Sequence, residues 1–137
     1  MKNVINPVYH RSRDSCPLLP PKGYGLSETS PMISMSPKGV DSSKHAGTAG
    51  ITPASTELRI RDVDTNAFLV RGGGVGEICI RGPQVMKGYL NNEKATKDCI
   101  DDDGWFYTGD IGYVSEEGYL FVTDRLKELI KYKGRHW

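Results

Sequence analysis

Two charged side chains near the C-terminal end, Asp110 and Arg125, have the types and the spacing to do chemistry together. Asp110 follows Gly109, where a strand is predicted to break, and Arg125 stands just after the next predicted hairpin. Because antiparallel strands return the chain to the same sheet edge, we expect the two side chains to meet. Aspartate accepts hydrogen bonds from hydroxyl groups and arginine donates them, so the pair could hold a vicinal diol such as a ribose. The alternative is a surface ion pair, which contributes little stability.

A second candidate group lies in the segment from Gly23 to Thr29, GYGLSET. Glycines on both sides of Tyr24 allow a sharp turn and leave one face of the ring open. Ser27 and Glu28 place a hydroxyl and a carboxylate side by side. The group could stack a purine on Tyr24, hold a phosphate oxygen with Ser27 and bind Mg²⁺ through Glu28, because this metal takes one or two carboxylates plus substrate phosphates. An ordinary turn is the alternative.

Short strands are the elements that must position these groups. Aromatic, β-branched or alternating apolar runs bounded by turn residues predict strands over residues 56–63, 76–81, 106–108, 112–114 and 119–123. Residues 31–53 are rich in Ser, Gly, Lys and Pro, which predicts a long loop. Asn91 or Asn92 can cap a short helix that runs through Cys99.

The two ends of the chain differ from its middle. Residues 1–22 carry prolines and charges with neither a helical nor a strand period, and we expect them to be disordered. The apolar residues of 126–130 fit a helical stripe, yet residues 129–133 also fit a strand that enters a turn at Gly134. A hairpin without its second strand would leave edge groups unpaired, so this end suggests a truncation.

Composition limits the classes to which this protein can belong. Its 137 residues fit one domain, and sixteen glycines with eight prolines favour turns and short strands over a helical bundle. A net charge of +1 gives no reason to expect nucleic acid or an anionic membrane as partner, and no apolar run approaches the roughly 20 residues of a membrane span. The three cysteines are an odd number at unrelated spacings, which favours a reducing intracellular compartment. Cys79 alternates with isoleucines and is expected to be a small packed residue rather than a nucleophile.

Four segments in this order, GYGLSE, GEICIRGPQVMKGYL, GWFYTGDIGY and DRLKELIKYKG, resemble the adenylate-forming acyl-CoA synthetase superfamily. The resemblance runs from about Gly23 to Gly134 and is strongest to the coumarate:CoA ligase and firefly luciferase-like branch. It implies an enzyme that uses ATP and Mg²⁺ to convert a carboxylic acid into an acyl adenylate. A thiol, coenzyme A, then displaces AMP to give a thioester. We expect this protein to be intracellular, either cytoplasmic or peroxisomal.

The resemblance also implies roles for the nucleotide-binding residues. Tyr24 would stack on adenine, with Gly23 and Gly25 opening the space, and Ser27 would face phosphate where the family usually has threonine. Asp110 and Arg125 would hold the ribose hydroxyls, in agreement with the diol chemistry above.

Other roles follow from the same resemblance. Glu28 would hold Mg²⁺, and Gly25 and Leu26 would border the acyl pocket. Lys127 falls at the hinge of the family's C-terminal lid, and Lys131 matches a catalytic lysine that faces the active site during thiol transfer. The tyrosine, the glutamate and the ribose-binding pair are expected to converge on one adenosine-sized cleft.

The implied fold is mainly β with short helices (α+β), the distorted β-barrel subdomain of an adenylate-forming enzyme. Residues 23–125 would be the C-terminal part of the large AMP-binding domain, and residues 126–137 the hinge and the truncated start of the lid. The family's phosphate loop, half of the acyl pocket and most of the lid are missing from these residues, so we expect this chain alone to be inactive. Without those partners, apolar strand faces at Leu58, Ile78 and Ile80 are expected to be exposed. The alternatives are a non-enzymatic β module or partner-binding truncated isoform, and a fragment of a luciferase-like oxygenase.

Overall fold

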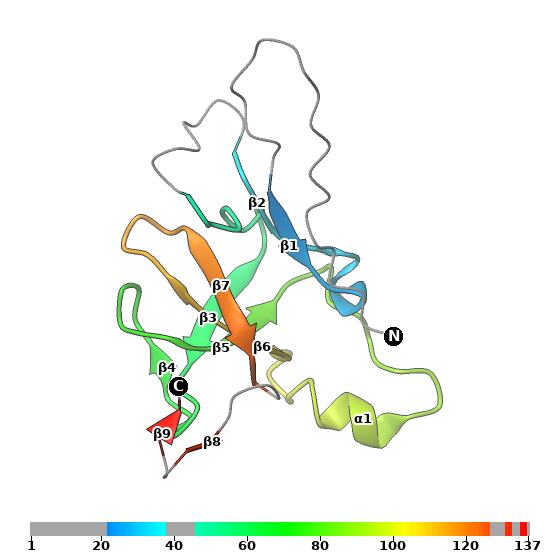
Figure 1. The fold of residues 1–137 in the computed structure, drawn as a ribbon. Coiled ribbons are helices and arrows are strands. Elements are labelled where there is room, and N and C mark those ends of the chain that lie inside the picture. Colours follow the sequence, from blue (N-terminus) through cyan, green and yellow to red (C-terminus); the bar gives the residue numbers. More distant parts are fainter. Residues whose placement is uncertain (1–21, 38–45, 127–130, 133–134, 137) are drawn as a thin grey trace.

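The computed structural model describes residues 22–37, 46–126, 131–132 and 135–136. Its centre is a five-stranded antiparallel sheet with strand order β4-β3-β5-β6-β7 (Figure 1). The strands are β3 (Glu57–Arg61), β4 (Phe68–Leu69), β5 (Gly76–Arg81), β6 (Phe106–Val114) and β7 (Leu120–Arg125). The prediction of a mainly β fold is therefore confirmed, and β5 has the bounds expected from sequence.

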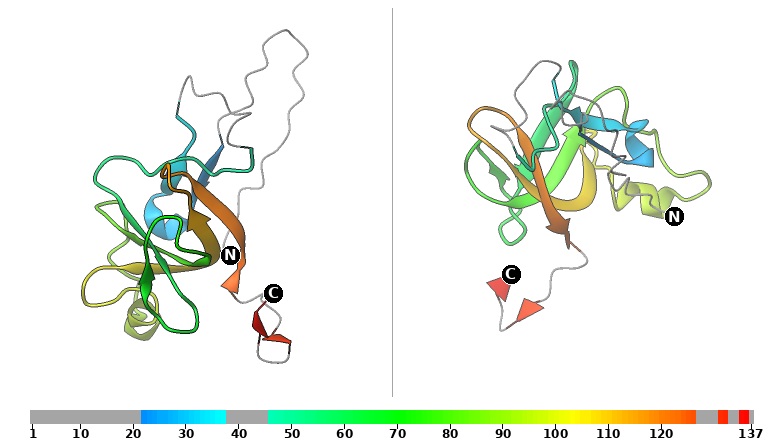
Figure 2. Two further views of the ribbon diagram at one scale, coloured as in Figure 1. Left: turned by 90° about the vertical axis from the view of Figure 1, so that its left-hand side faces the viewer. Right: turned by 45° about the horizontal axis from the view of Figure 1, so that its top comes forward.

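A second hairpin lies on one side of this sheet, which is strongly curved (Figures 1 and 2). It pairs β1 (Gly23–Gly25) with β2 (Met32–Met35), and a 3₁₀ turn at Ser27–Thr29 joins them. The prediction of a loop over residues 31–53 is wrong at β2 because Ile33, which has no exposed surface, supplies a core contact within the polar segment.

The strand β2 is connected to the large sheet through two isolated bridges. Met35 pairs with Ile51, and the neighbouring Gly50 pairs with Leu120 at the start of β7. In the part of the chain that the structure describes, β4 and β7 are the sheet edges and do not pair with each other. The expected barrel is thus not closed by these residues.

The core fills the space between the β1–β2 hairpin and the concave side of the sheet. It consists of apolar side chains that are at most 4% exposed: Leu26, Ile33, Ile60, Ile78, Ile80, Phe106 and Leu120. The expected exposure is wrong for Ile78 and Ile80, which are fully buried, whereas Leu58 is half-buried against the same core.

The other face of β3 and β5 is covered by a ladder of arginine and aromatic side chains. Trp105 is only 3% exposed because Arg59 and Arg81 lie over its ring, at 4.5 and 4.7 Å from the centroid. A cation–π contact attracts a charged guanidinium to the face of an aromatic ring, so both arginines can cover Trp105 while they remain charged. Cys79 on this face is fully buried, which confirms a small packed residue, and burial raises the pKa of its thiol to about 12.

The strand β6 continues through Gly109, where the sequence predicted a break. Gly109 has a positive φ of 71°, and the register to β5 shifts between Glu77 and Cys79. The Thr108 hydroxyl donates to the Ile78 carbonyl at 2.8 Å, which bridges the irregular stretch. A bulge of this type bends a strand without ending it, and the next residue, Asp110, is placed at the bend.

The helix α1 (Glu93–Lys97) is shorter than the predicted helix through Cys99. Of the two candidate caps, Asn92 is the N-cap, and its Oδ1 accepts from the Ala95 N–H at 3.0 Å. No helix in the described residues is both long enough and apolar enough to span a membrane.

The strands β8 (Lys131–Tyr132) and β9 (Arg135–His136) form a small antiparallel hairpin. The predicted strand before Gly134 agrees with β8, whereas residues 127–130 of the alternative helical stripe lie outside the described residues. The expectation that the second strand of the hairpin is absent is wrong, because β9 supplies it.

Candidate functional site

Three side chains from three different strands meet at one point. The Tyr24 hydroxyl from β1 donates a hydrogen bond of 2.6 Å to Asp110 Oδ2 on β6. Arg125 from β7 lies opposite Asp110 in the register, with its Nε at 3.5 Å from Oδ1. The expected meeting of Asp110 and Arg125 is confirmed, and the contact with Tyr24 joins residues that are 86 positions apart.

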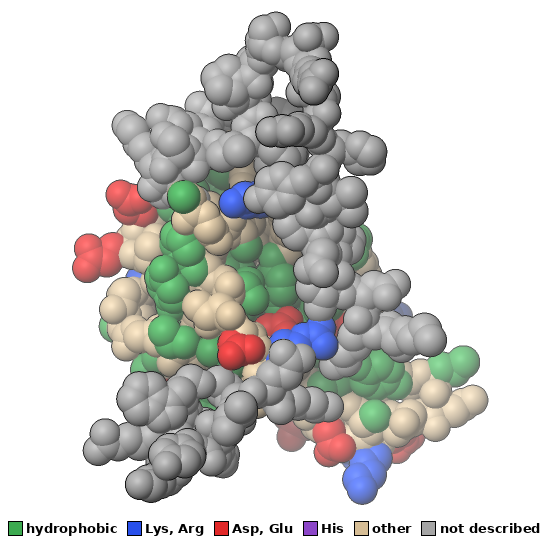
Figure 3. Space-filling model, in the orientation of Figure 1, with side chains coloured by type: hydrophobic (Ala, Val, Ile, Leu, Met, Phe, Trp, Pro, Cys, Tyr) green, Lys and Arg blue, Asp and Glu red, His purple; other side chains and the backbone are tan. Residues whose placement is uncertain are grey.

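The cluster is buried at its carboxylate and open at its guanidinium. The Asp110 side chain is 8% exposed and that of Arg125 is 33% exposed. Figure 3 shows acidic and basic side chains next to each other below a hydrophobic patch on the face that carries β7. Burial, followed by the negative charge of Asp110, raises the pKa of Tyr24 above its usual value, so the hydroxyl stays protonated and donates.

The turn after β1 owes its shape to Thr29, which the sequence analysis did not single out. Thr29 is fully buried, and its hydroxyl oxygen accepts from the Leu26 N–H at 3.1 Å while lying 3.0 Å from the Leu26 carbonyl. This closes the 3₁₀ turn and leaves Ser27 exposed. Thr29 could have been identified from the sequence, because it is a hydroxyl residue three positions after the first residue of the turn.

Gly25 and Leu26 have structural reasons to be present. A Cβ at Gly25 would lie 1.6 Å from the Pro31 carbonyl oxygen, so β1 and β2 can approach only at a glycine. A Cβ at Gly23 would come no closer than 3.4 Å to Ser34. Leu26 is 4% exposed and belongs to the core. The role of Gly25 and Leu26 at an acyl pocket stays a prediction.

Glu28 is held by a residue that sequence reasoning missed. The Tyr89 hydroxyl donates to Glu28 Oε1 at 2.7 Å, and Glu28 is 7% exposed. Burial and then the hydrogen bond to Glu28 raise the pKa of Tyr89 to about 12. Tyr89 lies within the segment GEICIRGPQVMKGYL, where only its aromatic type and its position after a glycine could have drawn attention.

The chemistry of Glu28 suits Mg²⁺ that is completed by phosphates and water. Among the described residues, no three His, Cys, Asp or Glu side chains gather into a set that could enclose a metal ion. A single carboxylate fits a cation that takes one or two protein ligands together with nucleotide phosphates, and does not fit an all-protein cage.

The two lysines named by resemblance are not tested by the structure. Lys127 lies outside the described residues, and of Lys131 only the backbone at the start of β8 is described. Their roles stay predictions.

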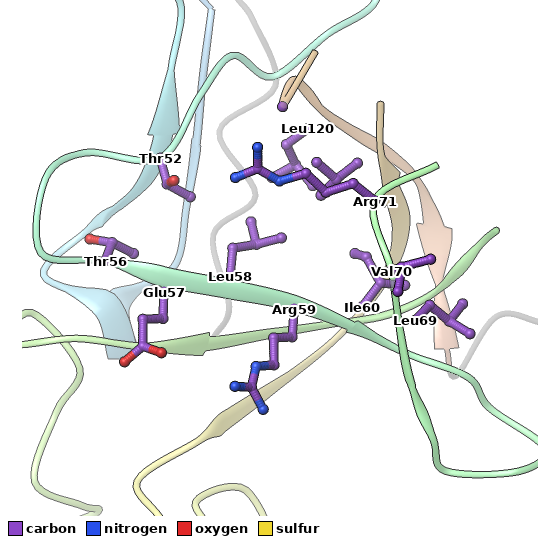
Figure 4. A pocket seen from close by; sticks show the side chains of 12 residues that line it. Thr52, Thr56, Glu57, Leu58, Arg59, Ile60, Leu69, Val70, Arg71 and Leu120 are labelled. Carbon is purple, nitrogen blue, oxygen red and sulfur yellow. The ribbon is translucent and has the colours of Figure 1, made fainter. Parts of the chain in front are cut away.

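A cavity of about 330 Å³ lies away from the cluster (Figure 4). Its apolar lining includes Leu58, Leu69 and Val114, and the side chain of Arg71 reaches across it toward Thr52. None of the predicted site residues lines this cavity. The structure therefore joins Tyr24 to Asp110 and Arg125, and Glu28 to Tyr89, and this cavity is not the expected cleft.

A family model described as "AMP-binding enzyme" matches residues 8–90. The 4-coumarate–CoA ligase 5 of Oryza sativa subsp. japonica is 50% identical over 119 residues, which cover 82% of this chain and 21% of the relative. The luciferin 4-monooxygenase of Nipponoluciola cruciata is 47% identical over 113 residues, which cover 82% of this chain and 20% of the relative.

Solved structures are also similar to most of this chain. ATP-bound MatB from Rhodopseudomonas palustris has a TM-score of 0.77 and 34% identity, covering 85% of this chain and 22% of MatB. MenE from Bacillus subtilis in complex with AMP has a TM-score of 0.72 and 34% identity, covering 85% of this chain and 23% of MenE. The chain thus spans about a fifth of the length of these proteins. Because the family model covers more than half of its residues, the chain belongs to the family of AMP-binding enzymes.

Proposed function

We propose that this chain carries part of the nucleotide-binding site of an AMP-forming acid:CoA ligase. In the longer protein, a carboxylate attacks the α-phosphate of ATP, which releases pyrophosphate and forms an acyl adenylate. The thiol of coenzyme A then attacks the acyl carbon and AMP leaves. The similarity to proteins named 4-coumarate–CoA ligases supports this reaction class.

The observation that carries the proposal is the contact of Tyr24, Asp110 and Arg125. Each Asp110 oxygen has more than one acceptor position, so a carboxylate that binds Tyr24 and Arg125 can still accept from ribose hydroxyls. Arg125 adds donors at the open end of the cluster. The hydrogen bond to Asp110 fixes the ring of Tyr24, on which adenine would stack, with Gly23 beside it and Ser27 facing phosphate.

Glu28 would hold the Mg²⁺ that accompanies ATP. When bound, the metal neutralises phosphate charge at the site of attack. The contribution of the chain itself is a mostly buried carboxylate with one oxygen held by Tyr89.

The chain by itself would bind ATP weakly and would not turn it over. Charge-assisted contacts from Asp110 and Arg125 are worth about 1.5–3 kcal/mol each, whereas association costs about 4 kcal/mol or more. We therefore expect a dissociation constant for Mg-ATP no better than about 1 mM. Missing electrostatic groups typically cost on the order of 10²–10³ in rate each, which predicts no detectable release of AMP.

Calorimetry and NMR titration of the purified chain with Mg-ATP test this proposal. Asp110→Asn is expected to weaken binding by at least about ten-fold, because the loss of a charged partner costs roughly 1.5–3 kcal/mol. Asp102→Asn, the same charge change at an exposed turn position, is the control and should leave binding unchanged. Equal affinities for the chain and for Asp110→Asn would remove Asp110 from the site, and micromolar binding would contradict the expected weak affinity.

The oxygenase alternative has a specific observation in its favour, because the luciferin 4-monooxygenase is similar over the same segment. Nucleotide binding is the step that both alternatives assign to this chain. Supplying the longer protein with acid, ATP, coenzyme A and oxygen separates them, since a thioester identifies the ligase and an oxidised acid identifies the oxygenase.

A further inference from the structure

We propose that Tyr89 is a positioning residue that fixes the orientation of Glu28 toward Mg²⁺. The inference rests on the proposed function, because it takes Glu28 as the metal ligand. It adds a residue that acts on the metal through the glutamate and does not touch the nucleotide.

The two carboxylate oxygens of Glu28 have different surroundings. Oε1 accepts from the Tyr89 hydroxyl at 2.7 Å, whereas no side-chain or backbone donor within the described residues binds Oε2. In that same part of the chain, Arg61 Nε is the single side-chain polar atom that is fully buried without a partner, so Oε2 keeps contact with solvent. One oxygen is therefore fixed by the protein and the other is open to a cation.

Tyr89 itself is held in place by two neighbouring elements. Its backbone N–H donates to Thr96 Oγ1 on α1 at 2.9 Å, and a Cβ at the preceding Gly88 would lie 2.8 Å from the Thr96 side chain. Three residues earlier, the Met86 N–H donates to the Glu28 carbonyl at 2.8 Å. The segment before α1 is thus tied both to the helix and to the turn that carries Glu28, which prevents the tyrosine from moving away.

The hydroxyl is a constant donor at physiological pH. A phenol is neutral at this pH because its ordinary pKa is about 10, and the contacts above hold its hydroxyl against Glu28 Oε1. Hydrogen-bonding partners of metal-binding carboxylates set ligand orientation, and their removal typically costs about 10–100-fold in metal affinity. The same size of effect is expected at Tyr89.

The test is a Mg²⁺ titration of the ¹⁵N-labelled chain in the presence of ATP, with the amide signals of residues 27–29 as the readout. Tyr89→Phe is expected to reduce the initial slope of the shift against Mg²⁺ concentration by about ten-fold or more. Tyr107→Phe is the matched control, because the Tyr107 hydroxyl donates to Asp101 Oδ2 at 2.7 Å and its pKa is also raised to about 12. The control should keep the slope of the unchanged chain.

The outcomes separate the inference from the proposed function. If the unchanged chain shows no Mg²⁺ response near Glu28, the metal role of Glu28 fails and the inference falls with it. If the chain responds and Tyr89→Phe responds equally, only the inference is overturned. Should Tyr89→Phe fail to fold, Thr96→Val is the second variant. It keeps the hydroxyl of Tyr89 but removes the threonine oxygen that accepts from the Tyr89 N–H, so it is expected to lose part of the Mg²⁺ response. An unchanged response in Thr96→Val would then overturn the inference.

Discussion

At the scale of single residues, the same contact occurs several times: a tyrosine hydroxyl donates to a carboxylate. Tyr24, Tyr89 and Tyr107 each donate to a carboxylate, at 2.6, 2.7 and 2.7 Å respectively. A neutral donor satisfies a carboxylate that is partly removed from water without bringing in a second charge. Each of the three tyrosines has its pKa raised, so the neutral form is favoured in the folded state.

This arrangement predicts a loss of stability in alkali. The pKa of Tyr107 rises from 10.0 to about 12 on folding, so its contribution is fully present below pH 10 and is lost as the pH rises from there toward 12. In this range the ionised tyrosine favours the unfolded state, so the free energy of unfolding falls as the pH rises. Urea unfolding between pH 9 and pH 11.5 should show a shallower decline for Tyr107→Phe than for the unchanged chain. Parallel declines would contradict the assigned cause.

At the scale of elements, the β1–β2 hairpin depends on one glycine of the Gly-Tyr-Gly sequence. Gly25→Ala forces a Cβ to within 1.6 Å of the Pro31 carbonyl oxygen, so the strands must separate. We expect a loss of about 3 kcal/mol or more in the free energy of unfolding, at or above the upper end for overpacking. The hydrogen bond from Tyr24 to Asp110 should be lost as well, since β1 carries Tyr24.

Gly23→Ala is the control for this change. Its new Cβ would make an ordinary contact of 3.4 Å with Ser34, and Gly23 does not need a positive φ. Comparison of the two variants by urea unfolding and by the NMR signals of β1 and β2 measures the effect. A Gly25→Ala variant as stable as Gly23→Ala would show that the close approach is not required.

The sequence predicted correctly those strands in which the local residue pattern and the burial agree. The strand β5 alternates Ile78 and Ile80 with Glu77 and Cys79, and its bounds were predicted correctly. The strand β2 was missed because its polar surroundings give no periodic pattern, while its burial comes from Ile33 packing under the large sheet. The continuation of β6 through Gly109 was missed because a bulge and a break have the same local sequence signal.

At the scale of the whole molecule, one core joins the hairpin to the sheet. Phe106 is 1% exposed and is among the largest fully buried side chains in the described residues. Phe106→Ala is expected to cost about 3–5 kcal/mol, because it removes buried area and leaves a cavity. That cost is a large share of the roughly 5–15 kcal/mol that stabilises a typical domain, so the variant should unfold at a clearly lower urea concentration than the unchanged chain.

Leu90→Ala is the matched apolar control, since Leu90 is 91% exposed. Its free energy of unfolding should change by less than about 0.5 kcal/mol. Urea unfolding followed by tryptophan fluorescence measures both variants, because Trp105 lies directly before Phe106. A small cost for Phe106→Ala would show that the hairpin and the sheet do not share one core.

The sequence by itself determined the chemical types at the site, the mainly β class and the family, because these depend on residue identities and on order along the chain. It also predicted that Asp110 and Arg125 meet, since antiparallel neighbours in one hairpin are local in sequence. Only the tertiary structure decided that Tyr24 binds Asp110 and that Tyr89 binds Glu28, across 86 and 61 positions. Such contacts depend on how the β1–β2 hairpin and the segment before α1 pack beside the sheet, and no local pattern encodes that packing.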